Sequence, residues 1–305
     1  MRATGQRLHL TGGRGRLAAL VAERFRASGH EVRLYSRTAT DGWHDLRKLE
    51  NPATLGPGDS LLHLGWSTLP ATSERDPGGE WQRDLPLLQR LLDATSASAA
   101  RTGEPPHFVF FSTGGAVYGN APGRPNREDD ACQPIGHYGR AKLAAEEIVR
   151  AHAARTGLPC AILRISNPYG YPVDPARMQG IVPHALRCAL SGDTLTLWGD
   201  GSARKDFLHY TDFLSGLELA LTRRLDGTFN LCAGESHTIR EVLDLVQRET
   251  GRTIAEQRAE APAWDVHDSR LSNDRFCAAT GWRPLVSLTE GIRRAARSHG
   301  TGGAV

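Results

Sequence analysis

Tyr138 and Lys142 stand four positions apart, and their chemistry is the most readily stated in this chain. The apolar residues that follow, such as Leu143 and Val149, recur at helical spacing, so this segment is predicted to be a helix. Residues four apart share one face of a helix, which brings the phenol and the ammonium side by side. A neighbouring ammonium stabilises the phenolate and lowers the pKa of the tyrosine. Such a tyrosine can exchange a proton while a hydride moves on or off the same carbon.

The same spacing also fits a surface tyrosine beside a lysine on an amphipathic helix. The chain has only three lysines, Lys48, Lys142 and Lys205, among 37 basic residues, so a chance match is uncommon. The catalytic interpretation requires a nucleotide site elsewhere in the chain.

A glycine-rich turn near the N-terminus is a candidate for that site. A β-like run at 7–11 leads directly into Gly12 and Gly15, and an amphipathic helix follows. This order is the context in which a glycine turn binds a dinucleotide. Gly12 permits the tight turn, Gly15 lets the backbone approach the pyrophosphate, and the helix N-terminus offers unpaired N–H groups. Arg14 lies within the turn and Ala18 fills its third small position. The alternative is a plain strand-to-helix turn.

The second predicted strand, 31–35, ends at Ser36 and Arg37. A cofactor with a free ribose 2′-hydroxyl is normally held by an acidic side chain at this place. A hydroxyl and a guanidinium are instead suited to a 2′-phosphate. We therefore predict that NADP(H) is favoured, with NAD(H) possible, unless Arg37 is only a solvated loop residue. Asp45 and Leu46 follow and could reach the adenine edge.

The elements that position these residues alternate between strands and helices through residue 165, which predicts an α/β fold with a doubly wound parallel sheet of the Rossmann type. Ligands of such sheets bind outside the carboxyl ends of the strands. Further strands are predicted at 60–65, 107–112 and 160–165, and a helix at 81–98. The residues at or just beyond these strand ends that we expect at the site are Leu64, Gly65, Ser112, Thr113, Ile165 and Asn167.

The pattern changes beyond Gly170, where prolines and shorter elements indicate a second, smaller lobe. We predict a dinucleotide-binding domain of 1–170 plus 206–232, and a C-terminal substrate-binding lobe of 171–205 plus 233–305. The later elements predicted are helices at 181–191, 213–221, 238–250 and 288–298, and strands at 194–198 and 228–231. A polar loop is expected between the last two helices.

The composition is that of an ordinary soluble globular protein, with 39% hydrophobic and 23% charged residues. A net charge of +3 gives no reason to expect nucleic acid or membrane binding. Five scattered cysteines without a C-x-x-C pair indicate reduced thiols, and no metal site is expected. No apolar stretch is long enough for a signal peptide or approaches the roughly 18 residues that span a bilayer. We therefore expect a cytoplasmic protein.

Six segments in order resemble the extended short-chain dehydrogenase/reductase superfamily, in its NAD(P)-dependent nucleotide-sugar epimerase/dehydratase branch (UDP-glucose 4-epimerase-like). The likeness covers nearly the whole chain. The segments are 11–18, 112–119, 138–142, 164–170, 199–207 with Asp212 after it, and 230–234.

The resemblance implies that Tyr138 is the acid/base and that Lys142 holds the nicotinamide ribose. A serine or threonine hydroxyl would polarise the carbonyl. The position where the family has that hydroxyl, four before Tyr118, is Gly114, so Thr113 or Ser112 must supply it. Dehydratases have Asp-Glu at the next two positions, where this chain has glycine and alanine, so elimination of water is not expected.

The resemblance also implies how a diphosphate would be held. The arginine that clamps it is replaced by Lys205, with Arg204 just before, and a second expected arginine is replaced by Pro262. Arg270 or Arg275 could reach the same anion, although a lysine lacks the two-pronged geometry of arginine. The remaining predicted substrate contact in this lobe is Trp198. The expected ligand is a UDP-, TDP- or GDP-sugar.

Two reactions at C4 of such a sugar remain open. A 4-epimerase keeps NAD bound, whereas a 4-ketoreductase exchanges NADPH, which the pair of Ser36 and Arg37 favours slightly. There are two alternatives to this chemistry. The first is a reductase of a non-sugar carbonyl on the same fold, and the second is a catalytically silent NADP(H) sensor. The segment 199–207 argues against the first, and retention of both Tyr138 and Lys142 argues against the second. The family further implies a homodimer formed through the helices at 81–98 and 138–154.

Overall fold

The computed structural model describes residues 5–40, 42–121, 123–172 and 178–300, which form two compact units. Unit 1 is Met1–Thr113, Gly136–Arg164 and Leu217–Phe229, and unit 2 is Gly114–Ile135, Ile165–Gly216 and Asn230–Val305. This division differs from the predicted domains mainly for 114–135 and 206–216, which belong to unit 2. Residues 173–177 of the predicted substrate lobe lie outside the described residues. The functional division stays a prediction, because compactness does not show what a unit binds.

Unit 1 is built on a seven-stranded sheet whose strand order is β10-β6-β5-β4-β1-β2-β3. The pairings that run from β5 through β4, β1 and β2 to β3 are parallel, which confirms the predicted fold class. Every residue of β4 and β6 is buried, as expected for central strands covered on both faces. The strands are β1 Arg7–Thr11, β2 Glu31–Ser36, β3 His44–Asp45, β4 Ser60–His63, β5 His107–Thr113, β6 Cys160–Ile165 and β10 Gly227–Leu231.

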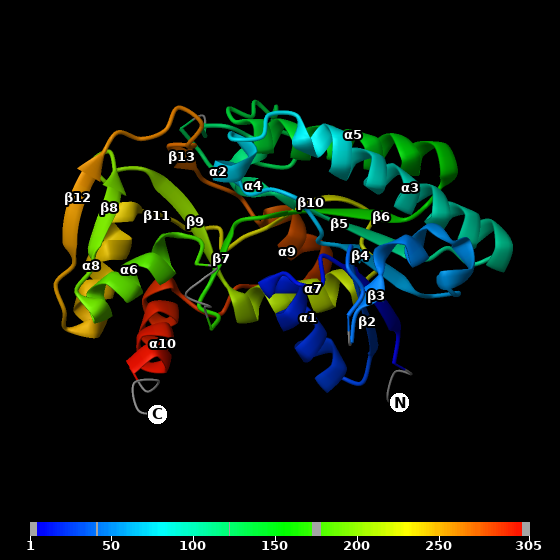
Figure 1. The fold of residues 1–305 in the computed structure, drawn as a ribbon, viewed down its shortest axis with the longest axis horizontal. Coiled ribbons are helices and arrows are strands. Elements are labelled where there is room, and N and C mark those ends of the chain that lie inside the picture. Colours follow the sequence, from blue (N-terminus) through cyan, green and yellow to red (C-terminus); the bar gives the residue numbers. More distant parts are fainter. Residues whose placement is uncertain (1–4, 41, 122, 173–177, 301–305) are drawn as a thin grey trace. The chain divides into compact units, whose positions relative to one another are not determined.

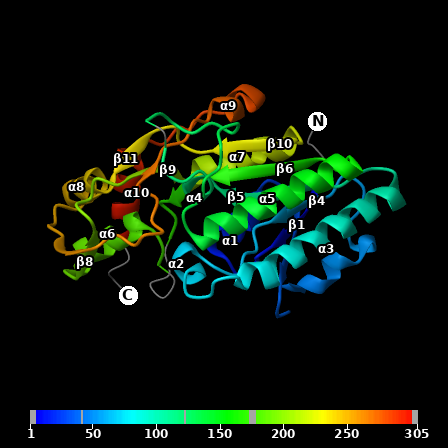
Figure 2. The same cartoon turned by 90° about the horizontal axis from the view of Figure 1, so that it is seen from above.

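Helices cover both faces of this sheet, with α1 on one side and α3 and α5 on the other (Figure 1). The last two lie side by side, as the view from above also shows (Figure 2). In α1, Ala18, Val21, Ala22 and Phe25 are the buried residues, and their spacing places one apolar stripe on the sheet. The helices of unit 1 are α1 Arg16–Ala27, α2 Pro70–Ser73, α3 Gly79–Thr102 and α5 His137–Thr156, with 3-10 turns at Leu46–Glu50 and Pro52–Thr54.

Unit 2 combines small sheets with packed helices. Strand β9 is central in a four-stranded sheet, where it pairs with β7, β11 and β13, and β8 pairs in parallel with β12. The strands are β7 Asn167–Tyr169, β8 Thr194–Trp198, β9 Arg204–His209, β11 Ser236–Thr238, β12 Ala255–Ala259 and β13 Asp268–Ser269. The helices are α4 Gly114–Val117, α6 Ile181–Ser191, α8 Ile239–Thr250, α9 Asp274–Thr280 and α10 Leu288–Gly300, and α7 Tyr210–Thr222 begins here.

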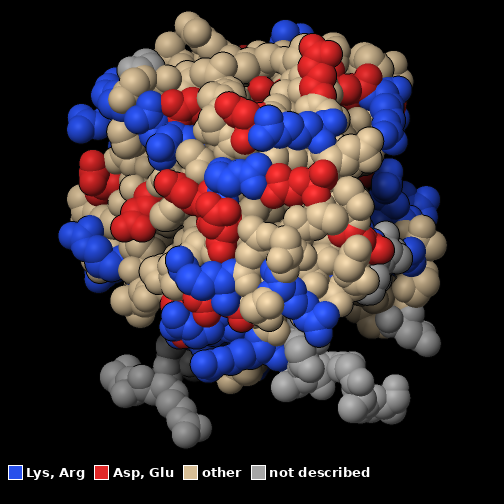
Figure 3. All heavy atoms as spheres, turned by 90° about the vertical axis from the view of Figure 1, so that its left-hand side faces the viewer, with Lys and Arg blue, Asp and Glu red and all other residues tan. Residues whose placement is uncertain are grey.

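The segment expected to be a polar loop between α8 and α10 contains β12, β13 and α9, so this prediction was wrong. All five residues of β12 are exposed, and its sequence has no apolar alternation from which a strand could be predicted. On the face of unit 2 that includes β12 and α8, basic and acidic side chains are interspersed (Figure 3). The ion pair of Arg240 on α8 with Glu256 on β12 is one example, at 2.6 Å. Such a face produces no long-range field of one sign.

Candidate active site

The glycine turn after β1 meets the end of β4 closely. Gly12 has a φ of +72°, and the N–H of Gly15 donates to its carbonyl oxygen at 2.7 Å. A Cβ on Gly12 would lie 2.7 Å from the backbone of Gly65, whose N–H donates to the Thr11 hydroxyl at 3.0 Å. The first turn of α1 has no side-chain cap, so its N–H groups are available to an anion. The structure thus brings three predicted cofactor residues together in a cradle that fits a dinucleotide pyrophosphate.

The end of β2 presents the hydroxyl and guanidinium groups predicted for a 2′-phosphate. Ser36 donates to the carbonyl oxygen of Thr38 at 2.5 Å, and Arg14 reaches the same oxygen at 3.4 Å. Arg37 is exposed and forms no ion pair with any carboxylate in the described part of the chain. The side chains expected at this position are therefore close to one another, and one guanidinium is available to a ligand.

Asp45 lies opposite Ser36 in the pairing of β2 with β3, but its carboxylate already accepts hydrogen bonds from within the protein. It caps the following 3-10 turn and accepts hydrogen bonds from the backbone and side chain of Arg47, which lower the pKa of Asp45 to about 2. The predicted contact of Asp45 with adenine stays a prediction, as does that of the buried Leu46.

Trp43 was missed by the sequence reasoning. A Cβ on Gly13 would lie 2.1 Å from its Cζ3 atom, so the indole ring rests directly on the glycine turn. The only signal in the sequence is that Trp43 precedes Asp45 by two residues, which places both on one side of an extended chain.

Tyr138 and Lys142 lie on α5 as predicted, but the ammonium is not directed at the phenol. The Nζ atom of Lys142 is 5.9 Å from the centre of the Tyr138 ring and donates to the backbone oxygen of Phe111 at 2.9 Å. It lies 3.8 Å from the centre of the Trp66 ring. Lys142 is 3% exposed, whereas Tyr138 is half-buried.

The prediction that Lys142 lowers the pKa of Tyr138 is wrong. Burial raises the pKa of the Tyr138 phenol, and the carboxylates of Glu80 and Asp84 raise it further. Burial also lowers the pKa of Lys142 to about 7. The sequence could not reveal this, because both carboxylates lie on α3, more than fifty residues before Tyr138 in the chain.

Of the two hydroxyls considered for catalysis, that of Ser112 is committed elsewhere. It donates to Glu146 at 2.5 Å, and Glu146 is also bound by Arg164 at 2.7 Å and by Arg150 at 3.0 Å. Ser112, Glu146 and Arg164 are all buried, so this is a structural network. The hydroxyl of Thr113, at the end of β5, makes no hydrogen bond to another described side chain. We therefore favour Thr113 over Ser112 as the hydroxyl that contacts a ligand, and both contacts stay predictions.

The cations expected to bind a diphosphate are in unit 2, and most of them are ion-paired. Lys205 donates to Asp265 at 2.9 Å and to the backbone of Val266. Arg270 donates to both oxygens of Asp268, at 2.8 and 2.6 Å.

Two further arginines complete this set. Arg275 is paired with Asp129. Arg204 is exposed, and its guanidinium donates to the backbone oxygen of Ser236 at 3.4 Å.

The remaining predicted contacts occupy different environments. Asn167 donates to the backbone oxygen of Asp206 at 2.9 Å, whereas Ile165 is buried and Leu64 is partly buried. Trp198 is 41% exposed at the end of β8, and its ring makes an edge-to-face contact with Trp264, 5.5 Å between centres. Trp264 was not predicted from the sequence.

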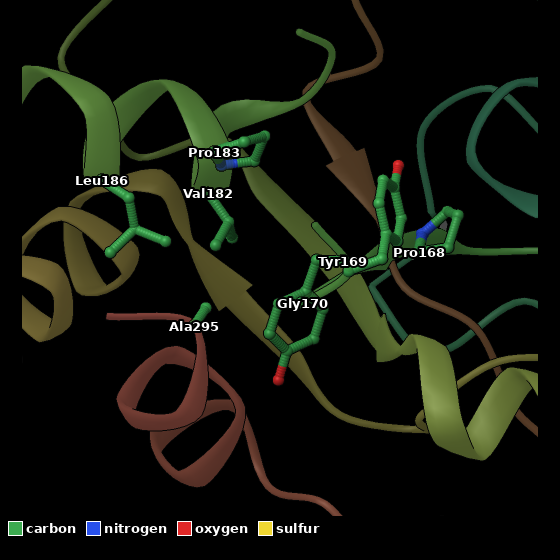
Figure 4. Close-up of a pocket in the computed structure, with 8 residues that line it drawn as sticks. Pro168, Tyr169, Gly170, Val182, Pro183, Leu186 and Ala295 are labelled. Atoms are coloured by element: carbon green, nitrogen blue, oxygen red, sulfur yellow. The ribbon is translucent and has the colours of Figure 1, made fainter. Parts of the chain in front are cut away.

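A small pocket in unit 2 lies between α6, α10 and the segment formed by β7 and the two residues after it (Figure 4). Val182 and Leu186 of α6 and Ala295 of α10 point into it, beside Tyr169. Its lining residues are uncharged, so it lacks the groups that would bind a phosphate.

The described residues contain no group of three or more His, Cys, Asp or Glu side chains that could hold a metal ion. Among the helices of the described residues, none combines the length and apolar character needed to cross a membrane.

Comparisons with known proteins agree with the geometry. The profile of the NAD dependent epimerase/dehydratase family matches residues 8–232. The chain is 26% identical over 305 residues to the UDP-glucose 4-epimerase of Mycolicibacterium smegmatis, covering 93% of this chain and 96% of that protein. It is 28% identical over 191 residues to the dTDP-4-dehydro-6-deoxyglucose reductase of Escherichia coli, covering 62% of this chain and 60% of that protein.

A solved structure extends the likeness to the whole chain. The complex of Thermus thermophilus UDP-glucose 4-epimerase with NAD superposes with a TM-score of 0.86 at 30% identity, covering 98% of this chain and 100% of that one. Together with the sheet order and the glycine cradle, these matches show that the chain belongs to the NAD dependent epimerase/dehydratase family, the nucleotide-sugar branch of the extended short-chain dehydrogenases/reductases.

Proposed function

We propose that this chain is a nucleotide-sugar 4-ketoreductase that uses exchangeable NADPH. Hydride transfer at C4 of a nucleotide-linked sugar is the chemistry that the family match and the named relatives support. The choice of reduction with NADPH rests on one observation, the exposed guanidinium of Arg37 beside Ser36 at the end of β2. A phosphate on the ribose is the group that this pair would recognise, whereas a free 2′-hydroxyl calls for a carboxylate.

The residues of unit 1 supply the acid chemistry of this reduction. When bound, the nicotinamide supplies a hydride. Tyr138 donates its phenolic proton to the C4 oxygen, and its raised pKa keeps that proton in place until charge develops on the oxygen. Thr113 donates a hydrogen bond to the same oxygen. Lys142 holds the nicotinamide ribose through its ammonium.

A 4-epimerase is the second candidate, favoured by full-length similarity to UDP-glucose 4-epimerases. An epimerase begins by removing a proton, and a phenol with a raised pKa is a poor base at neutral pH. The raised pKa of Tyr138 therefore favours reduction over oxidation as the first step.

The substrate contacts expected in unit 2 remain part of this proposal. Lys205, Arg204 and Arg270 are the cations that would bind the diphosphate, and Trp198 with Asn167 would contact the rest of the nucleotide-sugar. A cytoplasmic location and a homodimer are likewise proposals.

The cofactor preference can be tested by binding. We expect the wild type to bind NADPH at least tenfold more tightly than NADH, and Arg37→Ala to remove that difference by weakening NADPH alone. Arg33→Ala, in the same strand and paired with Glu31, is the control and should change neither affinity. Tightly bound NAD in the purified protein, with turnover of a UDP-sugar without added cofactor, would contradict the ketoreductase and establish the epimerase.

A further inference from the structure

Trp66, on the loop that follows β4, lies over the ammonium of Lys142. The centre of its ring is 3.8 Å from Nζ, closer than the ring of Phe110 at 4.9 Å. Nζ also donates to the backbone oxygen of Phe111. A cation over an indole face is stabilised by the π electrons, and more so where water is excluded. Trp66 is therefore the side chain that covers this buried charge.

Two buried carboxylates of α3 hold the residues that follow Trp66. Asp84 accepts hydrogen bonds from the backbone N–H of Ser67 at 3.1 Å and from its hydroxyl. Glu80, one helical turn earlier, accepts a hydrogen bond from the hydroxyl of Thr68 at 2.5 Å. Both carboxyl groups are buried, so these hydrogen bonds fix the loop and its indole to the helix.

Two polar atoms of this cluster are buried without a partner. They are the second carboxylate oxygen of Glu80 and the indole N–H of Trp66, neither of which has a hydrogen-bond partner in the described residues. Such atoms are uncommon in folded proteins and call for an explanation, which can be a catalytic role. Their position beside Lys142 and Tyr138 fits a set of side chains that acts on those two residues.

We propose that Trp66 is a positioning residue of the reaction, which holds the ammonium of Lys142 against the Phe111 carbonyl while Asp84 and Glu80 hold Trp66. This inference rests on the role of Lys142 in the proposed function, and it adds three residues that act through Lys142. None of the three needs to touch the substrate.

The protonation of Lys142 depends on this cover. Burial lowers the pKa of Lys142 to about 7, and the nearby carboxylates oppose that shift. Burial lowers the pKa of His63 to about 3 and raises that of Tyr138, so neither changes its charge near neutral pH. The groups facing Lys142 are Glu80 and Asp84 of α3, Tyr138 and Glu146 of α5, and His63 of β4. Replacement of Trp66 by leucine keeps an apolar side chain over the ammonium but removes the π electrons, which destabilises the charged lysine and lowers its pKa further.

The first test is an NMR titration of the protein without added cofactor, with isotope-labelled lysine side chains. The chain has three lysines, and Lys48→Arg identifies one of the three signals. We expect Trp66→Leu to lower the pKa of Lys142 by about half a unit or more, and Trp66→Phe, which keeps an aromatic face, to shift it less. Trp81→Phe, an exposed tryptophan on α3, is the control and should leave it unchanged.

A second variant keeps the proposal testable if Trp66→Leu does not fold. Ser67→Ala keeps the indole but removes the hydroxyl bond to Asp84, and we expect it to move the Lys142 titration in the same direction by a smaller amount. A Lys142 titration identical to that of the wild type in Trp66→Leu, or in Ser67→Ala if the first does not fold, overturns the proposal.

The second test is the pH dependence of kcat. Because the charged lysine is the active form, kcat falls as pH rises through the pKa of Lys142, and in Trp66→Leu this fall begins at lower pH. The loss of kcat is then greater at about pH 8 than at about pH 6. An equal loss at both pH values indicates structural damage alone and overturns the positioning role. If the wild type reduces no 4-keto-sugar, the proposed function fails, and the titration still decides the place of Trp66.

Discussion

Ser112 and Thr113 are neighbours at the end of β5, yet the structure gives their hydroxyls different roles. Ser112 is buried and donates to Glu146, which joins it to Arg164, whereas Thr113 is only partly buried. Strand alternation explains the difference, because consecutive side chains point to opposite faces of a sheet. Only one of two adjacent hydroxyls can then face a ligand.

A pair of single substitutions separates these roles. Thr113→Val should lower kcat by about 10²–10³-fold with little change in the free energy of unfolding, because it removes a donor to the developing oxyanion. Ser112→Ala should cost about 1–3 kcal/mol in unfolding free energy, because it leaves a buried carboxylate oxygen short of a donor, and should retain most of the activity. Kinetics with a 4-keto-sugar and NADPH, and urea unfolding, measure both. The reverse pattern would restore Ser112 as the catalytic hydroxyl.

The spacing of Tyr138 and Lys142 was sufficient to predict the helix and the pair, but not the pKa of either residue. Local spacing fixes which residues share a helix face, whereas a pKa depends on charges brought from other elements. The carboxylates of Glu80 and Asp84 and the cover by Trp66 come from such elements, so the sequence alone could not supply them.

Among the elements, the strand-turn-helix at the N-terminus depends most on residue type. Gly12 has a left-handed φ and also faces the backbone of Gly65. Gly29, at the other end of α1, has a similar φ of +88°, but a Cβ there would meet nothing within 4 Å. Both positions therefore have a backbone conformation that favours glycine, but only at Gly12 would an added side chain also meet neighbouring atoms.

This pair of glycines gives a matched test of the cradle. Both Gly12→Ala and Gly29→Ala should lose about 1 kcal/mol from the left-handed backbone. Gly12→Ala should in addition lose cofactor affinity by tenfold or more, because the new methyl group pushes the turn away from Gly65. Thermal unfolding and titration with NADPH measure the two effects. Equal cofactor affinity in the two variants would show that this approach is not needed for binding.

Most elements of unit 1 could be predicted from the sequence, because central strands are continuous apolar runs and the helices are amphipathic. The bounds of β1 and β6 agree with the predicted ranges, as do those of α6 and β8 in unit 2. Strand β12 and helix α9 were missed, since one is fully exposed and the other is short. Strand β9 was interpreted as part of a phosphate-binding segment. Its first three residues are charged, so the sequence lacks the apolar run that would have indicated a partly buried strand.

At the scale of the whole molecule, the similarity to the family extends over both units. This similarity does not by itself give the number of chains in the assembled protein. Helices α3 and α5 lie side by side on one face of the unit 1 sheet (Figure 2). Trp81, near the start of α3, is 52% exposed. Large exposed aromatic side chains are enriched at protein interfaces, so this face suits the proposed homodimer.

The dimer can be tested by light scattering. We expect the wild type to have twice the chain mass, and Trp81→Glu to weaken the dimer by tenfold or more, because a charge would be buried in the interface. Leu285→Glu, at an 85% exposed leucine of unit 2, is the control and should remain dimeric. A monomeric wild type would remove the interface from the proposal.

Lys205 and Arg270, which we propose to bind the diphosphate, are already paired with carboxylates. An incoming diphosphate must therefore exchange places with Asp265 or Asp268, and its affinity is a difference between two anions that compete for the same cation. On this proposal, the two aspartates weaken the hold on the product, and a neutral residue in place of either one would slow product release.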